Sequence, residues 1–173
     1  MTLPCRAFGW IRGVTCAGLV LFMASTSFVM AQSAPTPDPR VKTALEQANL
    51  KFTTTSLGNY KLTFEIEGTK RGQLVFVSSR TDKYNDMEIR KVWGVAYKTT
   101  KDLTAEMANR LLKDNTIEKL GAWEFGKQDD GFRVKYVVRV PADASPEVLS
   151  SAIRATMVTA DKMELELTGK DEF

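Results

Sequence analysis

Carboxylates and tyrosines are the residues best suited to chemistry in this chain, because histidine is absent and cysteine is confined to the N-terminus. None of the 173 residues is His, and the only two cysteines are Cys5 and Cys16. The usual proton shuttle at neutral pH, the thiolate nucleophile and the soft metal ligands are therefore missing from the rest of the chain. Proton transfer would have to come from Glu65 or Glu124 acting with Tyr136 in a small-molecule pocket. The composition therefore favours a binding function over an enzymatic one.

Two acidic clusters are further candidates for chemistry, and each has an ordinary structural explanation. Asp129-Asp130-Gly131 is the closest match to a calcium loop, but it lacks the spaced ligands and terminal Glu of an EF-hand. Asp-Gly is also a common hairpin signal. Glu65 and Glu67 share one face of an expected strand, where we expect ion pairs across the sheet with the basic residues Arg133, Lys135 and Arg139. We therefore predict no metal site and no cofactor.

The N-terminal segment has the features of a secretory signal peptide. Arg6 and Arg12 precede an apolar run, and the small residues Val29 and Ala31 precede a polar, proline-containing stretch. We predict cleavage after Ala31, with residues 1–31 as the signal peptide, residues 32–39 as a flexible leader and residues 40–173 as a single domain. The alternative is an uncleaved membrane anchor, since the apolar run approaches the length that spans a bilayer. Cleavage leaves no stable anchor and places the protein in the periplasm or outside the cell.

Removal of the signal peptide changes the charge of the chain. The full sequence has 24 basic and 21 acidic residues, and Arg6 and Arg12 both lie in the signal peptide, so the mature net charge falls from +3 to +1. Basic and acidic residues alternate along the remainder, whereas nucleic-acid binding needs a concentrated basic face. We therefore do not expect a nucleic-acid partner. Because both cysteines are also lost, the exported domain must be stable without disulfides.

The first half of the mature chain predicts one helix followed by strands. Apolar residues at helical spacing behind Asp38 and Pro39 predict a helix over 39–50. Strict alternation from Tyr60 predicts a half-buried strand. The expected strands cover residues 52–57, 60–67, 73–79 and 87–97, with a β-bulge near Arg90, where the alternation changes phase.

The second half predicts a helix, a hairpin and a long closing helix. The period is helical from about residue 100 to residue 115. Strands over 120–125 and 132–140 flank a hairpin turn at 126–131. Ser145-Pro146-Glu147 then combines an N-cap, a first-turn proline and a favourable negative charge, and it opens the last helix. Together the elements predict an α+β fold, with an antiparallel sheet of five or six strands and three helices in two layers.

Aromatic residues in the central strands are the candidates for partner binding. Trp93, Tyr97 and Trp123 belong to the aromatic content of the central strands, together with Phe125 and Tyr136. Such residues are most often core, but on an uncovered sheet face they mark an interaction surface. Trp93, Val95 and Tyr97 are expected in one register, and the phase break at Arg90-Lys91 leaves open whether the aromatic residues face the core or an exposed sheet face.

The order of elements, with several segments, resembles the YbjN-type bacterial proteins. The segments are ANRLLKDN at 108–115, KLGAWEF at 119–125, FRVKYVVRV at 132–140 and ADKMELELTGKDEF at 160–173. These proteins are described as sensory transduction regulators, and their fold is similar to that of type III secretion chaperones. The resemblance covers about residues 40–173 and implies a non-enzymatic role in binding protein segments and in forming dimers. Secretion chaperones act in the cytoplasm, however, whereas this chain is expected to be exported.

Two functions follow as expectations. The first is a non-enzymatic periplasmic binding or regulatory module, which engages an unidentified protein partner through an exposed sheet face or a helix–sheet groove and forms a homodimer. The second is a small-molecule pocket protein or a histidine-independent enzyme of cone-shaped fold, with Glu65 or Glu124 and Tyr136 as its candidate residues.

Overall fold

The computed structural model describes residues 36–173, so the predicted signal peptide lies outside the described residues. The fold class and the order of elements are confirmed: three helices and an antiparallel sheet of six strands. The elements are α1 (Pro39–Gln47), β1 (Thr53–Thr54), β2 (Tyr60–Glu65), β3 (Gly72–Tyr84), β4 (Met87–Thr99), α2 (Ala105–Asp114), β5 (Gly121–Gln128), β6 (Gly131–Pro141) and α3 (Pro146–Thr168). The first predicted strand, over 52–57, is reduced to two residues.

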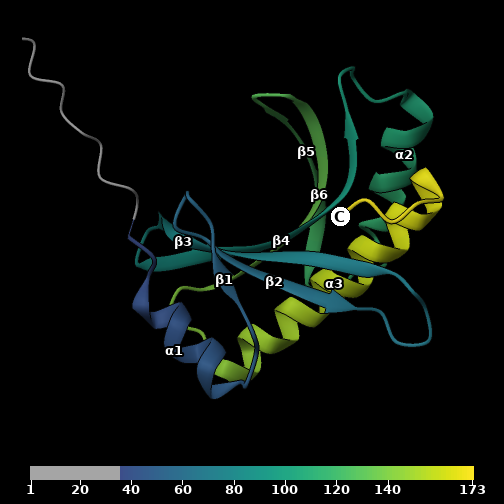
Figure 1. Ribbon diagram of the computed structural model, residues 1–173. Coiled ribbons are helices and arrows are strands. Elements are labelled where there is room, and N and C mark those ends of the chain that lie inside the picture. Colours follow the sequence, from purple (N-terminus) through teal and green to yellow (C-terminus); the bar gives the residue numbers. More distant parts are fainter. Residues whose placement is uncertain (1–35) are drawn as a thin grey trace, which may run out of the picture. The chain divides into compact units, whose positions relative to one another are not determined.

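The strands lie in the order β1-β2-β3-β4-β6-β5, and every neighbouring pair is antiparallel (Figure 1). Because β3 and β4 separate β2 from β6, the predicted ion pairs between Glu65 and the basic residues of β6 do not form. The two arginines have nearer partners, Arg133 pairing with Asp130 and Arg139 with Glu124, whereas Lys135 makes no ion pair within residues 36–173. The β5–β6 hairpin does form, and its turn consists of Asp129 and Asp130 alone.

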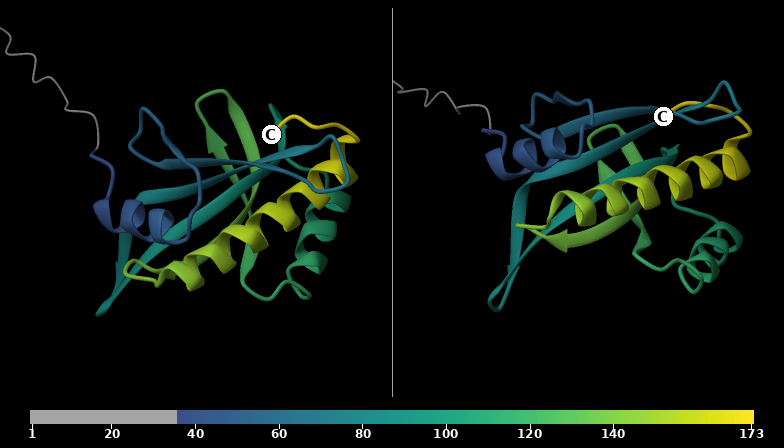
Figure 2. Two further views of the ribbon diagram at one scale, coloured as in Figure 1. Left: turned by 60° about the horizontal axis from the view of Figure 1, so that its bottom comes forward. Right: turned by 90° about the horizontal axis from the view of Figure 1, so that it is seen from below.

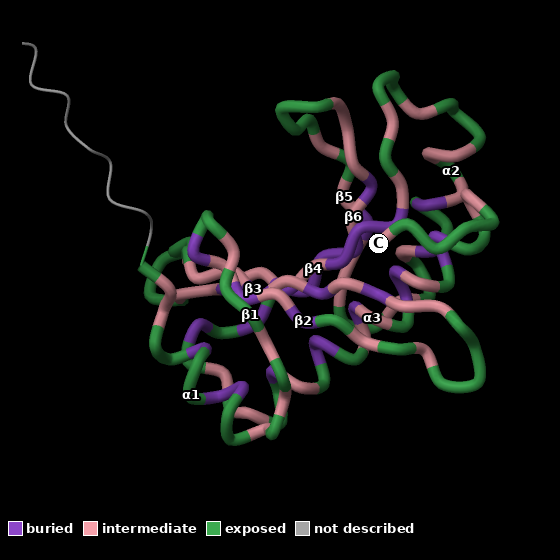
Figure 3. Tube along the Cα trace, in the orientation of Figure 1, coloured by how far each residue is buried: buried purple, intermediate pink, exposed green. Residues whose placement is uncertain are grey.

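All three helices pack on one face of the sheet, and α1 and α3 lie together beneath it (Figure 2). α3 approaches the sheet closely at Gly94, where an added Cβ would lie 2.9 Å from the Cβ of Ala160 in α3. Glycine therefore lets the helix sit against the middle of the sheet. The core runs from there along β4 and β6 and the inner sides of α1 and α3 (Figure 3).

The predicted helix caps at Asp38 and Ser145 are confirmed, and Thr104 caps α2, for which no cap was predicted. The side chains of Asp38, Thr104 and Ser145 accept backbone N–H groups in the first turns of α1, α2 and α3. Gly169 ends α3 in the left-handed conformation, with φ of 65°. Among the helices of residues 36–173, none is long and apolar enough to cross a membrane.

Two irregularities in the sheet differ from the sequence prediction. The bulge predicted in β4 near Arg90 is not present, because β4 pairs with β6 without interruption from Ile89 to Val95 and its alternation keeps one phase. The irregularity lies in the facing strand β3, where Val77 pairs with Val92 and Thr81 with Arg90, so Ser78, Ser79 and Arg80 lie opposite Lys91 alone. A second bulge lies in β4, because Val95 pairs with Lys135 and Tyr97 with Val134, leaving Ala96 extra. Neighbouring apolar residues hide this second bulge in the sequence pattern.

Candidate functional site

The face of the sheet opposite the helices carries an apolar centre. Side chains on this outer face come from alternate positions of four central strands. Phe76 on β3 is directly opposite Trp93 on β4, and Trp93 is directly opposite Val137 on β6. Leu74 and Val95 extend the apolar centre along the strands. We call these five residues, Leu74, Phe76, Trp93, Val95 and Val137, the outer apolar patch.

Phe76 and Trp93 form a stacked aromatic pair at the middle of the outer apolar patch. Their ring centroids are 5.4 Å apart and the ring planes differ by 17°. Both side chains remain partly exposed, while Val137 beside Trp93 is only 2% exposed although the helices pack on the opposite face. The aromatic pair therefore shields its aliphatic neighbours and presents its own surface to solvent.

Lysines surround the outer apolar patch. Lys61 on β2 is opposite Phe76, Lys91 precedes Trp93 by two residues on β4, and Lys135 on β6 is opposite Val95. Within residues 36–173, none of the three makes an ion pair. Burial lowers the pKa of Lys135, and the charges of Lys91 and Arg133 lower it further, against an opposing effect from Glu124.

The three aromatic residues suggested by the sequence lie in different environments. Trp93 belongs to the outer apolar patch. The bulge at Ala96 reverses the face of the strand, so Tyr97 pairs with the core residue Val134 and packs against the core. Trp123 also faces the helices and is 8% exposed. The expectation of one register for Trp93 and Tyr97 is therefore wrong, and the structure does not bring the three together.

Trp123 links β5 to α2 through polar contacts. Its indole Nε1 donates to a carboxylate oxygen of Asp114 over 2.8 Å, and its backbone N–H donates to Asn115 over 2.7 Å. Arg110 binds the other carboxylate oxygen of Asp114 at 3.1 Å. These contacts hold α2 against the edge strand β5. They also occupy the indole N–H of Trp123, which is therefore not free to bind a partner.

The candidate residues for proton transfer are also separated. Tyr136 faces the helices and is 0% exposed, and its hydroxyl donates to Glu118 over 3.2 Å. Glu124 lies opposite Lys135 on the outer face, as its alternation with Trp123 requires, and Glu65 lies at the end of β2. Burial, reinforced by Glu118, raises the pKa of Tyr136 to about 12, so the hydroxyl holds its proton at neutral pH.

In the Asp129–Asp130 turn, two basic residues bind the carboxylate of Asp130. Asp130 binds Lys98 at 2.7 Å and Arg133 at 2.8 Å, and hydrogen bonds from these two residues lower its pKa to about 2. In the described part of the chain, no three side chains of the metal-binding types come together.

Several open grooves lie between the helices and the sheet, and two of them have aromatic residues in their lining. A groove of about 640 Å³ separates β2 from α3, and Leu50, Phe64 and Met157 line its apolar part. A second groove, of about 410 Å³, lies between α2 and β5, with Leu112, Trp123 and Phe125 along it. Neither groove has an unpaired buried charge among the residues that line it.

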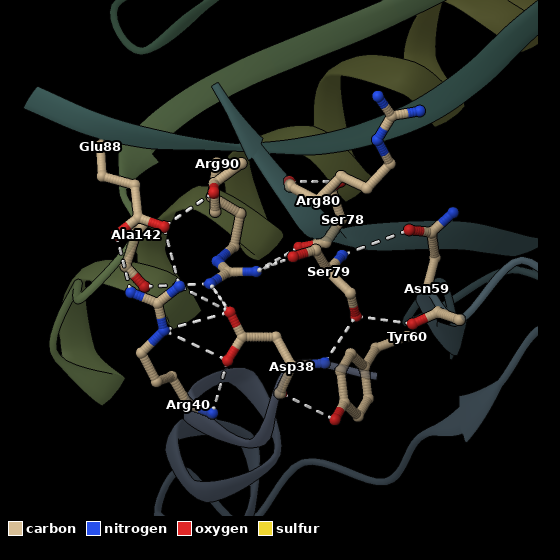
Figure 4. A network of polar contacts seen from close by, with 12 residues as sticks. Asp38, Arg40, Asn59, Tyr60, Ser78, Ser79, Arg80, Glu88, Arg90 and Ala142 are labelled. Atoms are coloured by element: carbon tan, nitrogen blue, oxygen red, sulfur yellow. Dashed lines mark hydrogen bonds and ion pairs between the residues drawn. The ribbon is translucent and has the colours of Figure 1, made fainter. Parts of the chain in front are cut away.

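A polar cluster that the sequence did not reveal lies at the β3 bulge (Figure 4). Arg90 is 2% exposed, and its guanidinium donates to the carbonyl oxygens of Ser78, Ser79 and Ala142 and to Asp38. Arg90 thus satisfies the carbonyl oxygens that the bulge releases from the ladder. The only sequence signal was the charged residue at an apolar position of the alternating pattern.

Asp38 completes this cluster from the start of α1. Its N–H donates to Ser79 Oγ, its carbonyl oxygen accepts the Tyr60 hydroxyl, and its carboxylate binds Arg40 and Arg90. Asp38 was expected to belong to a flexible leader, but every polar group it carries is bound. The cluster therefore fastens the start of the folded domain to the sheet, and we assign it a structural role.

Acid should weaken this attachment. Burial alone would raise the pKa of Asp38, but hydrogen bonds from Arg40 and Arg90 lower it well below its usual range. A carboxyl group whose pKa is lower in the folded state stabilises the fold above its unfolded pKa and loses that contribution as pH falls. We therefore expect the urea midpoint to fall steadily from about pH 5 to about pH 2.

Asp38→Asn isolates this effect, because asparagine still caps a helix but does not titrate. The variant should be less stable than wild type at about pH 5 and should show a shallower decline toward about pH 2. Glu164 acts in the opposite direction, since burial raises its pKa and protonation in acid suits the fold. Parallel declines for the variant and wild type would contradict the role given to Asp38.

No protein-family model matches the chain, and a comparison with curated proteins found no similar sequence. The YbjN resemblance therefore stays a prediction.

Proposed function

We propose that this chain is an exported, non-enzymatic binding module that holds a protein partner against the outer face of its sheet. The observation that carries the proposal is the stacked pair of Phe76 and Trp93, at the centre of the sheet face opposite all three helices. An aromatic pair in such a place contributes most when a partner covers it.

The arrangement of the outer face supports a protein partner. Protein interfaces combine an apolar, aromatic centre with a polar rim, and energetically important residues gather at the centre. Here the outer apolar patch is the centre, and Lys61, Lys91 and Lys135 form the rim. The groove beside α3 has Phe64 as its single aromatic residue and both acidic and basic residues in its lining, and the groove beside α2 has no lysine or arginine in its lining.

The alternative functions have less support. The candidate acid–base residues of an enzyme lie on different faces, and the Tyr136 hydroxyl already has a partner in Glu118. The grooves are open, whereas a small-molecule site normally encloses most of its ligand. The predicted export signal supports an envelope or extracellular protein as the bound partner, and the YbjN resemblance supports a regulatory role for binding.

Site-specific crosslinking in the producing cells tests the proposal. A photoreactive phenylalanine analogue at position 76 samples the outer face, and the same analogue at position 158 samples an exposed site on α3. We expect a discrete covalent adduct with one protein from position 76 and no such adduct from position 158. Equal adducts from both positions, or none from position 76, would contradict the proposal.

Trp93→Ala provides the second half of this test. If Trp93 is central to the interface, the variant should bind its partner about tenfold or more weakly, so the adduct from position 76 should fall steeply. Leu112→Ala, an exposed apolar residue on α2, serves as the matched control and should leave the adduct unchanged. An undiminished adduct in Trp93→Ala would place the binding surface elsewhere.

A further inference from the structure

Positive charge is concentrated around the outer apolar patch although the mature chain is nearly neutral. Lys61, Lys91 and Lys135 approach the patch from three strands, and none has an ion-pair partner among residues 36–173. Glu124, the carboxylate directly opposite Lys135, is already bound by Arg139. The local excess of cations is therefore not neutralised by the chain itself.

The environment of Lys135 makes this excess costly. The side chain is partly buried beside Val95 and lies near Lys91 and Arg133, and these conditions lower its pKa. Like charges held close together in a partly desolvated site repel one another. A negatively charged group placed between Lys91 and Lys135 would relieve that repulsion.

The aromatic pair gives this face an apolar contact surface at its centre. Phe76 and Trp93 stand on neighbouring strands, with ring centroids 5.4 Å apart and ring planes that differ by 17°. Both side chains remain partly exposed, so an apolar side chain of a partner can be buried against them.

We propose that the partner segment bound at this face is acidic, with at least one apolar side chain between its carboxylates. The apolar side chain lies on Phe76 and Trp93, and the carboxylates pair with Lys61, Lys91 and Lys135. This inference rests on the proposed function, because it gives the chemistry of the partner that the outer face would hold.

The test uses the purified chain and two short fluorescein-labelled peptides, observed by fluorescence anisotropy. One peptide alternates Asp and Glu with Leu and Phe, and the other has Asn and Gln in place of every acid. We expect saturable binding of the acidic peptide only, with about tenfold weaker affinity when salt rises from about 0.05 to about 0.3 M. Equal binding of both peptides, or of neither, overturns the inference.

Matched triple variants test whether binding of the acidic peptide depends on the three lysines around the outer apolar patch. Lys61→Gln, Lys91→Gln and Lys135→Gln together should weaken the acidic peptide about tenfold or more. The control combines Lys101→Gln, Lys113→Gln and Lys119→Gln, which removes the same charge from exposed positions outside the sheet. If both triple variants weakened the affinity for the acidic peptide equally, the effect would come from net charge alone, and the inference would be overturned.

Two further results separate this inference from the proposed function. Tighter binding of single-stranded oligothymidine than of the acidic peptide overturns the inference in favour of nucleic acid. A crosslinked protein partner at position 76, combined with no binding of the acidic peptide, overturns the acidic chemistry and leaves the binding face in place. Absence of the crosslinked partner is the result that removes the proposed function itself.

Discussion

Replacing Arg90 with methionine should lower the free energy of unfolding by about 3–5 kcal/mol. Methionine fills a similar volume with apolar atoms but cannot donate hydrogen bonds. It therefore leaves Arg40 as the cation that binds the Asp38 carboxylate and removes the donors that serve Ser78, Ser79 and Ala142. The cost combines a weakened ion pair with buried carbonyl oxygens that lose their hydrogen bonds.

Arg80→Met is the matched control, because Arg80 belongs to the same bulge and its side chain is exposed. It should change stability by less than about 0.5 kcal/mol. Urea unfolding followed by circular dichroism measures the stability of both variants. Their urea midpoints can be compared directly when the free energy of unfolding falls with urea concentration at similar slopes. Equal midpoints for Arg90→Met and Arg80→Met would mean that the Arg90 guanidinium contributes nothing measurable to the fold.

The double variant separates the ion pair from the bulge. The stability loss in Arg90→Met could come mainly from the Asp38 carboxylate, which no longer binds Arg90. In that case Asp38→Asn should recover part of the lost stability in the Arg90→Met background. If the loss comes mainly from the unsatisfied carbonyl oxygens of Ser78 and Ser79, Asp38→Asn should add to it. The sign of the coupling energy between the two substitutions therefore shows whether the ion pair with Asp38 or the hydrogen bonds to the bulge contribute more to stability.

Local patterns explain why the order of elements could be predicted from the sequence. Alternation from Phe132 to Val140 and the Ser145-Pro146-Glu147 start of α3 depend on neighbouring residues only. The bulge at Ala96 gives no such signal, because the residues on both sides of it are apolar and either phase fits the pattern. That single extra residue separates Trp93 from Tyr97 onto opposite faces.

Tertiary contacts explain what the sequence could not predict. Asp38 was recognised as a helix cap, a local role, but its partner Arg90 lies 52 residues away. The lysines of the outer face come from three strands, and their proximity depends on β6 pairing with β4 and not with β2. The same strand order removed the expected partners of Glu65. Charge clustering on a sheet therefore follows from strand order, which alternation alone does not determine.

The second large effect is expected at Tyr136, whose replacement by alanine should cost about 3–5 kcal/mol. The side chain is fully buried on the helix-facing side of β6, where its ring packs edge-on against Trp123 with centroids 5.2 Å apart. Alanine would leave a cavity between the sheet and α3, and the surrounding groups can fill it only in part.

Two further variants divide that cost. Tyr136→Phe keeps the ring and loses only the hydrogen bond to Glu118, so it should cost about 1 kcal/mol. Tyr84→Ala removes the same side chain from a site that is 71% exposed, and it should stay within about 0.5 kcal/mol of wild type. Urea midpoints of the three variants should therefore fall in the order Tyr84→Ala, Tyr136→Phe, Tyr136→Ala. If Tyr136→Phe were as destabilising as Tyr136→Ala, the buried hydroxyl and its link to Glu118 would matter more than the packing of the ring.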